Sequence, residues 1–180
     1  LAQSLQNRGL RLAYGGTDTH LLLVDLKSVK SANGEFPRGE VAARLLEICG
    51  IIVNKNTIPG DEITALASGI RLGTPWVTQR GMREQDMDQI ADFIYRIVRE
   101  IRPFQYLGLS GVLPRGKVPF SLIRQVRREV DEFALRFEPK TQQRSTYPHY
   151  HLHPVQRPSA WAPRPQEADA GTVSRALKDG

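Results

Sequence analysis

The sequence predicts a small α/β domain in which a short sheet is covered by helices on one face, followed by an irregular C-terminal extension. Two stretches place apolar residues at helical spacing, and short apolar runs of strand length lie around them. Near residue 140 this periodicity stops, and five of the twelve prolines fall within 148–165. A segment so poor in aliphatic residues buries too little apolar surface to offset its ordering entropy, so we expect it to be irregular.

The N-terminal part begins with a predicted helix over 1–8 that ends at Gly9. A short strand over 10–14 follows. The run HLLLVDL over 20–26 predicts a strand buried on both faces, because most of its residues are apolar. The spacing of apolar residues over 38–49 then predicts a helix.

The middle of the chain alternates strands and loops. The run IIVN over 51–54 predicts a second buried strand, and 57–67 predicts a loop that turns at Pro59-Gly60-Asp61. Residues 70–72 predict a third strand. A long amphipathic helix is expected over 84–101, where the apolar residues form one stripe.

A second long helix is predicted over 119–137, because Pro119 suits the start of a helix. We therefore divide the chain into a domain over 1–105, a helical extension over 106–140 and a Pro/His-rich irregular tail over 141–180.

The composition limits the class of protein. The 180 residues carry a formal charge of +6, which suits anionic partners such as phosphates, carboxylates or nucleic acid and does not choose among them. A single cysteine, Cys49, excludes an internal disulfide framework. We therefore expect a cytoplasmic or redox-indifferent protein. No apolar run approaches the roughly 18 residues that cross a bilayer, so no transmembrane helix and no membrane partner are expected. The chain opens with Leu1 rather than Met, and we expect it to be part of a longer protein.

The first loop of chemical interest is YGGTDTH, from Tyr14 to His20. Its two glycines permit positive φ, and its Thr and Asp side chains can hydrogen-bond their own backbone. We therefore interpret the loop as structural, with His20 as a satisfied structural histidine rather than a catalyst.

The second loop begins with Asn54-Lys55-Asn56, just after a predicted strand. An asparagine amide offers both donors and an acceptor, which suits a heterocycle with the same mixture. The alternative is that Asn54 and Asn56 only cap backbone groups. The residue types leave both interpretations open.

The third loop, ASGIRLGTP, places Arg71 in a predicted strand between two apolar residues and close to Gly69 and Gly73. A planar guanidinium in a small-residue setting is suited to a bidentate clamp on a carboxylate or phosphate. The alternative is an internal ion pair with an acidic residue of the chain.

Other charged motifs are weaker. Three histidines alternate in PHYHLHP, but the nearby sequence offers no acidic or cysteine ligand, so we expect no metal site. The arginines at 124, 127 and 128 are interpreted as a solvated helix face. Aromatic residues do not interleave with them, so no nucleic-acid surface is expected.

Four motifs taken together, GGTDTH, VNKNTIPGD, ASGIRLGTP and TQRG, resemble the C-terminal part of the serine hydroxymethyltransferases over residues 1–105. The resemblance implies the small C-terminal domain of a type I aminotransferase-fold enzyme that uses pyridoxal 5'-phosphate. That family interconverts serine plus tetrahydrofolate with glycine plus 5,10-methylene-tetrahydrofolate, and works as a homodimer or a pair of dimers. The part after about residue 105 suggests either a longer variant or a junction to another domain.

The resemblance also assigns roles to residues. Arg71 matches the arginine that binds the substrate carboxylate, and Asn56 matches the asparagine that contacts the folate pterin. Thr64, Ala65 and Leu66 align with a backbone stretch at the folate site, where some members carry Ser-Pro-Phe. None of the six lysines follows a segment like the one that carries the Schiff-base lysine, so we expect no catalytic residue in these 180 residues and an inactive isolated chain.

Two alternatives remain open. A threonine aldolase or transaldolase of the same fold would need Arg71 but not the folate contact. A catalytically inactive partner domain would bind without reacting.

Overall fold

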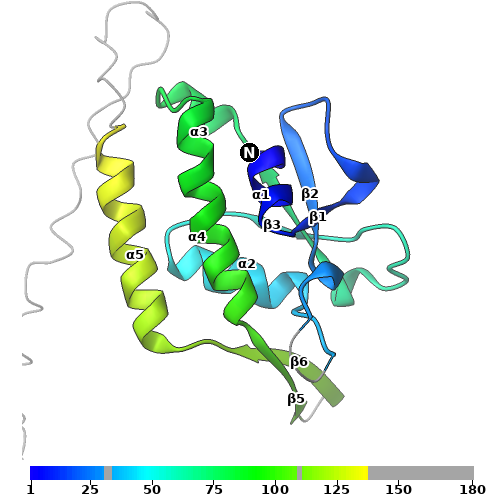
Figure 1. The fold of residues 1–180 in the computed structure, drawn as a ribbon. Coiled ribbons are helices and arrows are strands. Elements are labelled where there is room, and N and C mark those ends of the chain that lie inside the picture. The colour runs from blue at the N-terminus through cyan, green and yellow to red at the C-terminus, as the bar shows by residue number, and fades with distance from the viewer. Residues whose placement is uncertain (31–33, 109–110, 138–180) are drawn as a thin grey trace, which may run out of the picture. The chain divides into compact units, whose positions relative to one another are not determined.

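The computed structural model describes residues 1–30, 34–108 and 111–137 (Figure 1), all within one compact unit, Leu1–Thr141. The expected tail over 141–180 and the three alternating histidines lie outside the described residues. The helices are α1 (Ala2–Asn7), α2 (Gly39–Ile48), α3 (Pro75–Gln79), α4 (Met87–Glu100) and α5 (Phe120–Leu135). The strands are β1 (Arg11–Leu12), β2 (Leu21–Asp25), β3 (Asn54–Asn56), β4 (Gly69–Gly73), β5 (Arg102–Gly108) and β6 (Gly111–Lys117).

Strands β1 to β4 form one antiparallel sheet in the order β1-β2-β4-β3. Its inner face carries Leu22, Val24, Ile70 and Leu72, all buried in one core with residues of α1, α2 and α4. The predicted mixed α/β layer, with a short sheet under helices, is therefore confirmed.

The prediction that the strand over 20–26 is buried on both faces is wrong. Leu21 of β2 is 39% exposed and Leu23 is half-buried, while Leu22 and Val24 between and beyond them are buried. Residues of α1, α2 and α4 pack against the inner face, whereas on the outer face of β2 only Asp25 is buried. Apolar content alone does not distinguish a strand covered on both sides from one whose second face is left exposed.

The predicted strand over 51–54 is also misplaced, because pairing begins only at Asn54. Helix α2 ends in a Schellman motif, in which Gly50 adopts φ +85° and Ile51 N–H donates to the Leu46 carbonyl at 2.9 Å. This cap uses the start of the apolar run, and Ile52 is left 84% exposed.

Strands β5 and β6 form an antiparallel hairpin that the sequence did not predict. The extension expected to be helical over 106–140 is helical only from Phe120 onward. Pro103 and Pro114 lie within the two strands. Both strands of a two-stranded ribbon are edge strands, in which proline is tolerated. Proline weakens the sequence pattern of a strand, so the ribbon was not predicted.

The two long helices were predicted correctly. Helix α4 follows a short 3₁₀ turn over Glu84–Asp86 and buries most of the expected apolar stripe. Helix α5 lies beside it (Figure 1), joined by an edge-on contact of Phe93 with Phe133 and by a two-point ion pair of Arg96 with Glu129. In the part of the chain that is described, no helix is long and apolar enough to cross a membrane.

Candidate functional site

The outer face of the sheet carries polar side chains in one row. Arg71 of β4 lies directly opposite Leu23 of β2 on one side and Asn54 of β3 on the other. Directly paired residues in antiparallel strands share a face. Asn56 is two residues beyond Asn54 and therefore lies on this same face, diagonal to Arg71.

A pocket of about 330 Å³ opens over this row. It is lined by residues of all three loops singled out in the sequence: Ala13, Tyr14, Gly16, Thr17, Leu21, Leu22, Leu23, Asn56 and Arg71. The fold thus brings together Arg71, Asn56 and Gly16, which the sequence separates by up to 55 positions.

Arg71 is exposed on the outer face. Among the described residues, no carboxylate forms an ion pair with it, unlike Arg11, Arg44, Arg96 and Arg127. The internal ion pair weighed as the alternative is therefore not formed within that part of the chain. A guanidinium presents five N–H donors in a planar fork, so Arg71 is suited to a planar, bidentate anion.

The glycine-rich loop is held by its own side chains, as its structural interpretation predicts. Thr19 N–H donates to Thr17 Oγ1 at 3.1 Å, and Leu21 N–H donates to Thr19 Oγ1 at 3.2 Å. Tyr14 adopts φ +60°, in the left-handed region, and its side chain is 86% exposed at the pocket. His20 is exposed, and its backbone carbonyl oxygen accepts from Thr74 N–H at 3.1 Å.

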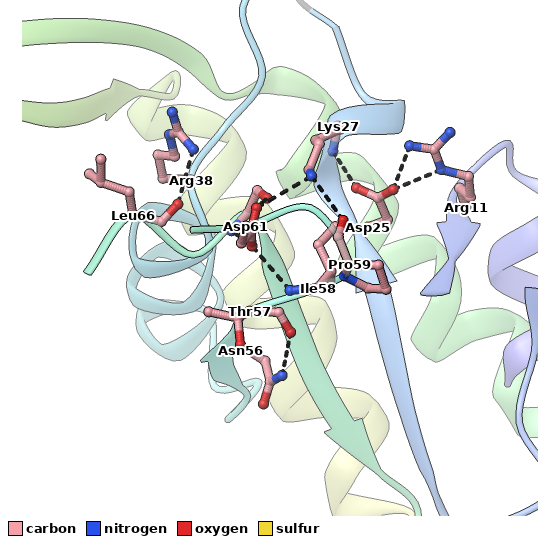
Figure 2. Close-up of polar contacts among 11 residues, drawn as sticks. Arg11, Asp25, Lys27, Arg38, Asn56, Thr57, Ile58, Pro59, Asp61 and Leu66 are labelled. Atoms are coloured by element: carbon pink, nitrogen blue, oxygen red, sulfur yellow. Dashed lines mark hydrogen bonds and ion pairs between the residues drawn. The ribbon is translucent and has the colours of Figure 1, made fainter. Parts of the chain in front are cut away.

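Asn56 both faces the pocket and caps the backbone. Its Nδ2 donates to the carbonyl oxygen of Thr57 at 2.6 Å (Figure 2). That bond uses one of the amide's donors, and an amide has a second N–H and an acceptor oxygen. Asn54 is exposed beside it. The two interpretations of Asn56 are therefore compatible.

Thr64, Ala65 and Leu66 form a 3₁₀ turn that does not line the Arg71 pocket. Thr64 and Ala65 are exposed, and the Leu66 carbonyl accepts from Arg38 Nη1 at 3.0 Å. Leu66 instead borders a second pocket of about 450 Å³ beside the β5–β6 hairpin. The structure thus brings Arg71 and Asn56 together and leaves the 64–66 turn apart from them.

Asp61 is the residue of this region whose role the sequence did not show. Its Oδ2 accepts from Ile58 N–H at 3.0 Å and from Ser68 N–H at 2.9 Å. Its Oδ1 accepts from the Ser68 hydroxyl and pairs with Lys27 Nζ at 3.3 Å. Figure 2 shows the carboxylate between Lys27 and Ile58. The sequence marked Asp61 only as a turn residue, because its partners lie up to 34 positions away.

The surroundings of Asp61 act on its pKa in opposite directions. Burial favours the neutral acid and raises the pKa. The hydrogen bonds from Ser68, Ile58 and Lys27 favour the carboxylate and outweigh burial, so that the pKa falls from its ordinary 3.8 to about 2. Asp61 is therefore ionised throughout the physiological range.

The described residues do not fit a binding site for pyridoxal phosphate. Lys27 pairs with Asp61, Lys55 pairs with Glu40, and Lys117 lies over the ring of Phe104. Lys30 is exposed, and none of these four described lysines lines the Arg71 pocket. Within the same residues there is no group of three or more His, Cys, Asp or Glu side chains that could hold a metal ion.

Comparison with known proteins identifies the family. The serine hydroxymethyltransferase family model matches residues 1–94. A serine hydroxymethyltransferase from Bombyx mori is 48% identical over 143 residues, which cover 76% of this chain and 30% of that protein. Serine hydroxymethyltransferases from Chlamydia pneumoniae and Chlamydia caviae are each 37% identical over 138 residues, or 76% of this chain and 27% of theirs. The chain spans about three tenths of the length of the curated relatives that it matches. It belongs to the serine hydroxymethyltransferase family.

Proposed function

We propose that these residues are the C-terminal part of a serine hydroxymethyltransferase that interconverts serine plus tetrahydrofolate with glycine plus 5,10-methylene-tetrahydrofolate. The observation that supports this most directly is the pocket shared by Arg71 and Asn56. The Arg71 guanidinium suits an anion such as an amino-acid carboxylate. The Asn56 amide suits a heterocycle such as a pterin. The active enzyme is proposed to be a homodimer or tetramer of the longer chain in the cytoplasm.

Arg71 is proposed to bind the carboxylate of serine or glycine. Leu21 and Leu23 flank it on the outer face and exclude part of the water, which strengthens a charge-assisted hydrogen bond. Two parallel N–H donors hold the carboxylate in one plane, and so fix the orientation of the bonds at the substrate's Cα. Arg71 thus positions the substrate and moves no proton.

Asn56 is proposed to contact the folate pterin with the part of its amide that the Thr57 carbonyl does not use. The 64–66 turn lies further along the same loop and is proposed to contact the folate through its backbone. Three groups of the turn are already used: the Leu66 carbonyl accepts from Arg38, Leu66 N–H donates to the Ile63 carbonyl, and the Thr64 carbonyl accepts from Ala67 N–H. The N–H groups of Thr64 and Ala65 and the Ala65 carbonyl are proposed to make the contact.

Pyridoxal phosphate is proposed to be bound by parts of the longer protein outside these residues, since the Arg71 pocket offers no lysine. The experiment is to express the full-length protein that contains this chain, and separately the 180 residues alone. With serine and tetrahydrofolate, the full-length protein should form glycine and methylene-tetrahydrofolate. The 180 residues alone should be inactive and should form no borohydride-reducible adduct with pyridoxal phosphate.

Two results would contradict the proposal in different ways. Cleavage of β-hydroxy amino acids by the full-length protein, with no response to folate, would indicate the threonine aldolase alternative. A full-length protein that binds serine and folate but forms no product would indicate an inactive partner domain.

A further inference from the structure

The loop between β3 and β4 leaves the sheet and returns to it at the same place, so its two ends lie side by side. Asn56, before the loop, is paired with Gly69, after it. Residues 57–68 between them contain only the short turn Thr64–Leu66. Such a loop has few backbone bonds of its own, so side chains must fix its path.

One carboxylate fixes both ends of this loop. Asp61 receives N–H donors from Ile58 near its start and from Ser68 at its end, and also the Ser68 hydroxyl. The Asp61 side chain is only 5% exposed and Ser68 is fully buried, so water does not readily replace these bonds. In this way Asp61 closes the loop on itself.

Lys27 attaches the closed loop to the sheet. It lies in the 3₁₀ turn Leu26–Ser28 that follows β2, and its Nζ bonds both Asp61 and the Pro59 carbonyl oxygen (Figure 2). In the same place Leu26 N–H donates to the Ser68 carbonyl at 3.0 Å. Asp61 therefore closes the loop and also joins it, through the ion pair with Lys27, to the turn that follows β2.

The contacts of Asp61 with Ile58, Ser68 and Lys27, called the clamp from here on, are connected to the Arg71 pocket through Ile58. That side chain is 6% exposed and lies against Gly69, where a Cβ would come within 2.5 Å of Ile58 Cγ2. Because Asp61 holds the N–H of Ile58, it determines where the chain leaves β3. Asn56 lies two residues before Ile58 and lines the pocket with Arg71.

We propose that Asp61 is a positioning residue for the folate side of the site, which acts through Ile58 and Ser68 to hold Asn56 and the 64–66 turn in their binding geometry. The inference rests on the proposed function, because it assigns Asp61 to the folate contact of that site. Asp61 does not line the pocket itself.

The test compares Asp61→Asn with wild type in the full-length protein. Asparagine keeps the size but loses the charge, and its NH₂ group must face donors in either orientation: the N–H groups of Ile58 and Ser68, or the Ser68 hydroxyl and Lys27. We expect the KM for tetrahydrofolate to rise about tenfold while the KM for serine stays within twofold. Glu129→Gln is the matched control: it also removes a paired carboxylate, but on α5, and should leave both KM values unchanged.

A second readout needs no activity. Amide hydrogen exchange at Ile58 and Ser68, measured in the full-length protein, should accelerate in Asp61→Asn and stay unchanged in Glu129→Gln. Lys27→Met should accelerate it less, because both backbone bonds to Asp61 remain.

Three outcomes overturn the inference. Unchanged exchange at both amides would mean that the clamp does not hold the loop. Faster exchange with an unchanged KM for folate, or with equal losses for folate and serine, would make Asp61 merely structural. If the wild-type enzyme itself shows no use of folate, the proposed function fails and the inference falls with it, whereas a failure confined to Asp61→Asn leaves the proposed function intact.

Discussion

Asn56 on β3 lies diagonal to Arg71 on β4, and the two side chains line one pocket on the open face of the sheet. The pairing of Asn54 with Arg71 and of Asn56 with Gly69 sets this relationship. A slip of one residue between the strands would turn Asn56 to the buried face. The register of β3 against β4 is therefore the structural condition for the proposed site.

Gly69 should be intolerant of any side chain. A Cβ there would lie 2.5 Å from Ile58 Cγ2 and 2.9 Å from the Asn56 carbonyl oxygen. We expect Gly69→Ala to lower the free energy of unfolding by about 1–3 kcal/mol, because the backbone of β3 must shift. Urea denaturation measures this.

Gly16→Ala is the control for that substitution, since nothing lies within 4 Å of a Cβ there. It should change the free energy of unfolding by less than about 0.5 kcal/mol. Equal effects of the two substitutions would show that the close approach at Gly69 is not what matters.

The stability of the domain should depend on pH through the ionisation of Asp61. Its pKa is about 2 in the folded chain against an ordinary 3.8. A carboxyl group with a depressed folded pKa contributes stability that is complete above the unfolded pKa and lost as pH falls through the folded one. We expect about 2 kcal/mol to disappear between roughly pH 5 and pH 2.

The measurement is the free energy of unfolding against pH for wild type and Asp61→Asn. The difference between the two should be largest above about pH 5 and should shrink toward pH 2. A constant difference across this range would show that the ionised carboxylate is not the stabilising form.

Helix α5 should depend on the ion pair that joins it to α4. Arg96 holds both carboxylate oxygens of Glu129, at 2.5 and 3.1 Å, and lowers the pKa of Glu129. The pair is partly buried, so Glu129→Gln should lower the free energy of unfolding by about 1 kcal/mol. Asp131→Asn, which removes an exposed pair within α5, should cost less than half as much. Thermal unfolding compares the two, and a larger loss from Asp131→Asn would contradict this assignment.

Much of the fold followed from apolar spacing. The helices over 38–49, 84–101 and 119–137 were predicted within a few residues, because one apolar stripe per helix faces the core. The run over 51–54 was not, because its first residues cap α2 rather than pair with a strand. Spacing cannot show which of two local bonds a backbone N–H will form.

The sequence predicted which residues form the site but not how they are arranged in space. Arg71 and Asn56 stood out by residue type and position, but their shared pocket depends on strand order and register. The clamp at Asp61 was missed because its partner Lys27 lies 34 positions earlier and the turn motif explained Asp61 locally.

The most direct test of the proposed site is the KM for serine of Arg71→Lys in the full-length protein. Lysine keeps the charge but cannot form two parallel hydrogen bonds to a carboxylate. With Arg124→Lys on the exposed face of α5 as the control, Arg71→Lys should raise the KM by roughly a hundredfold or more, equivalent to about 3 kcal/mol. A KM for serine within twofold of wild type would show that Arg71 does not bind the substrate carboxylate.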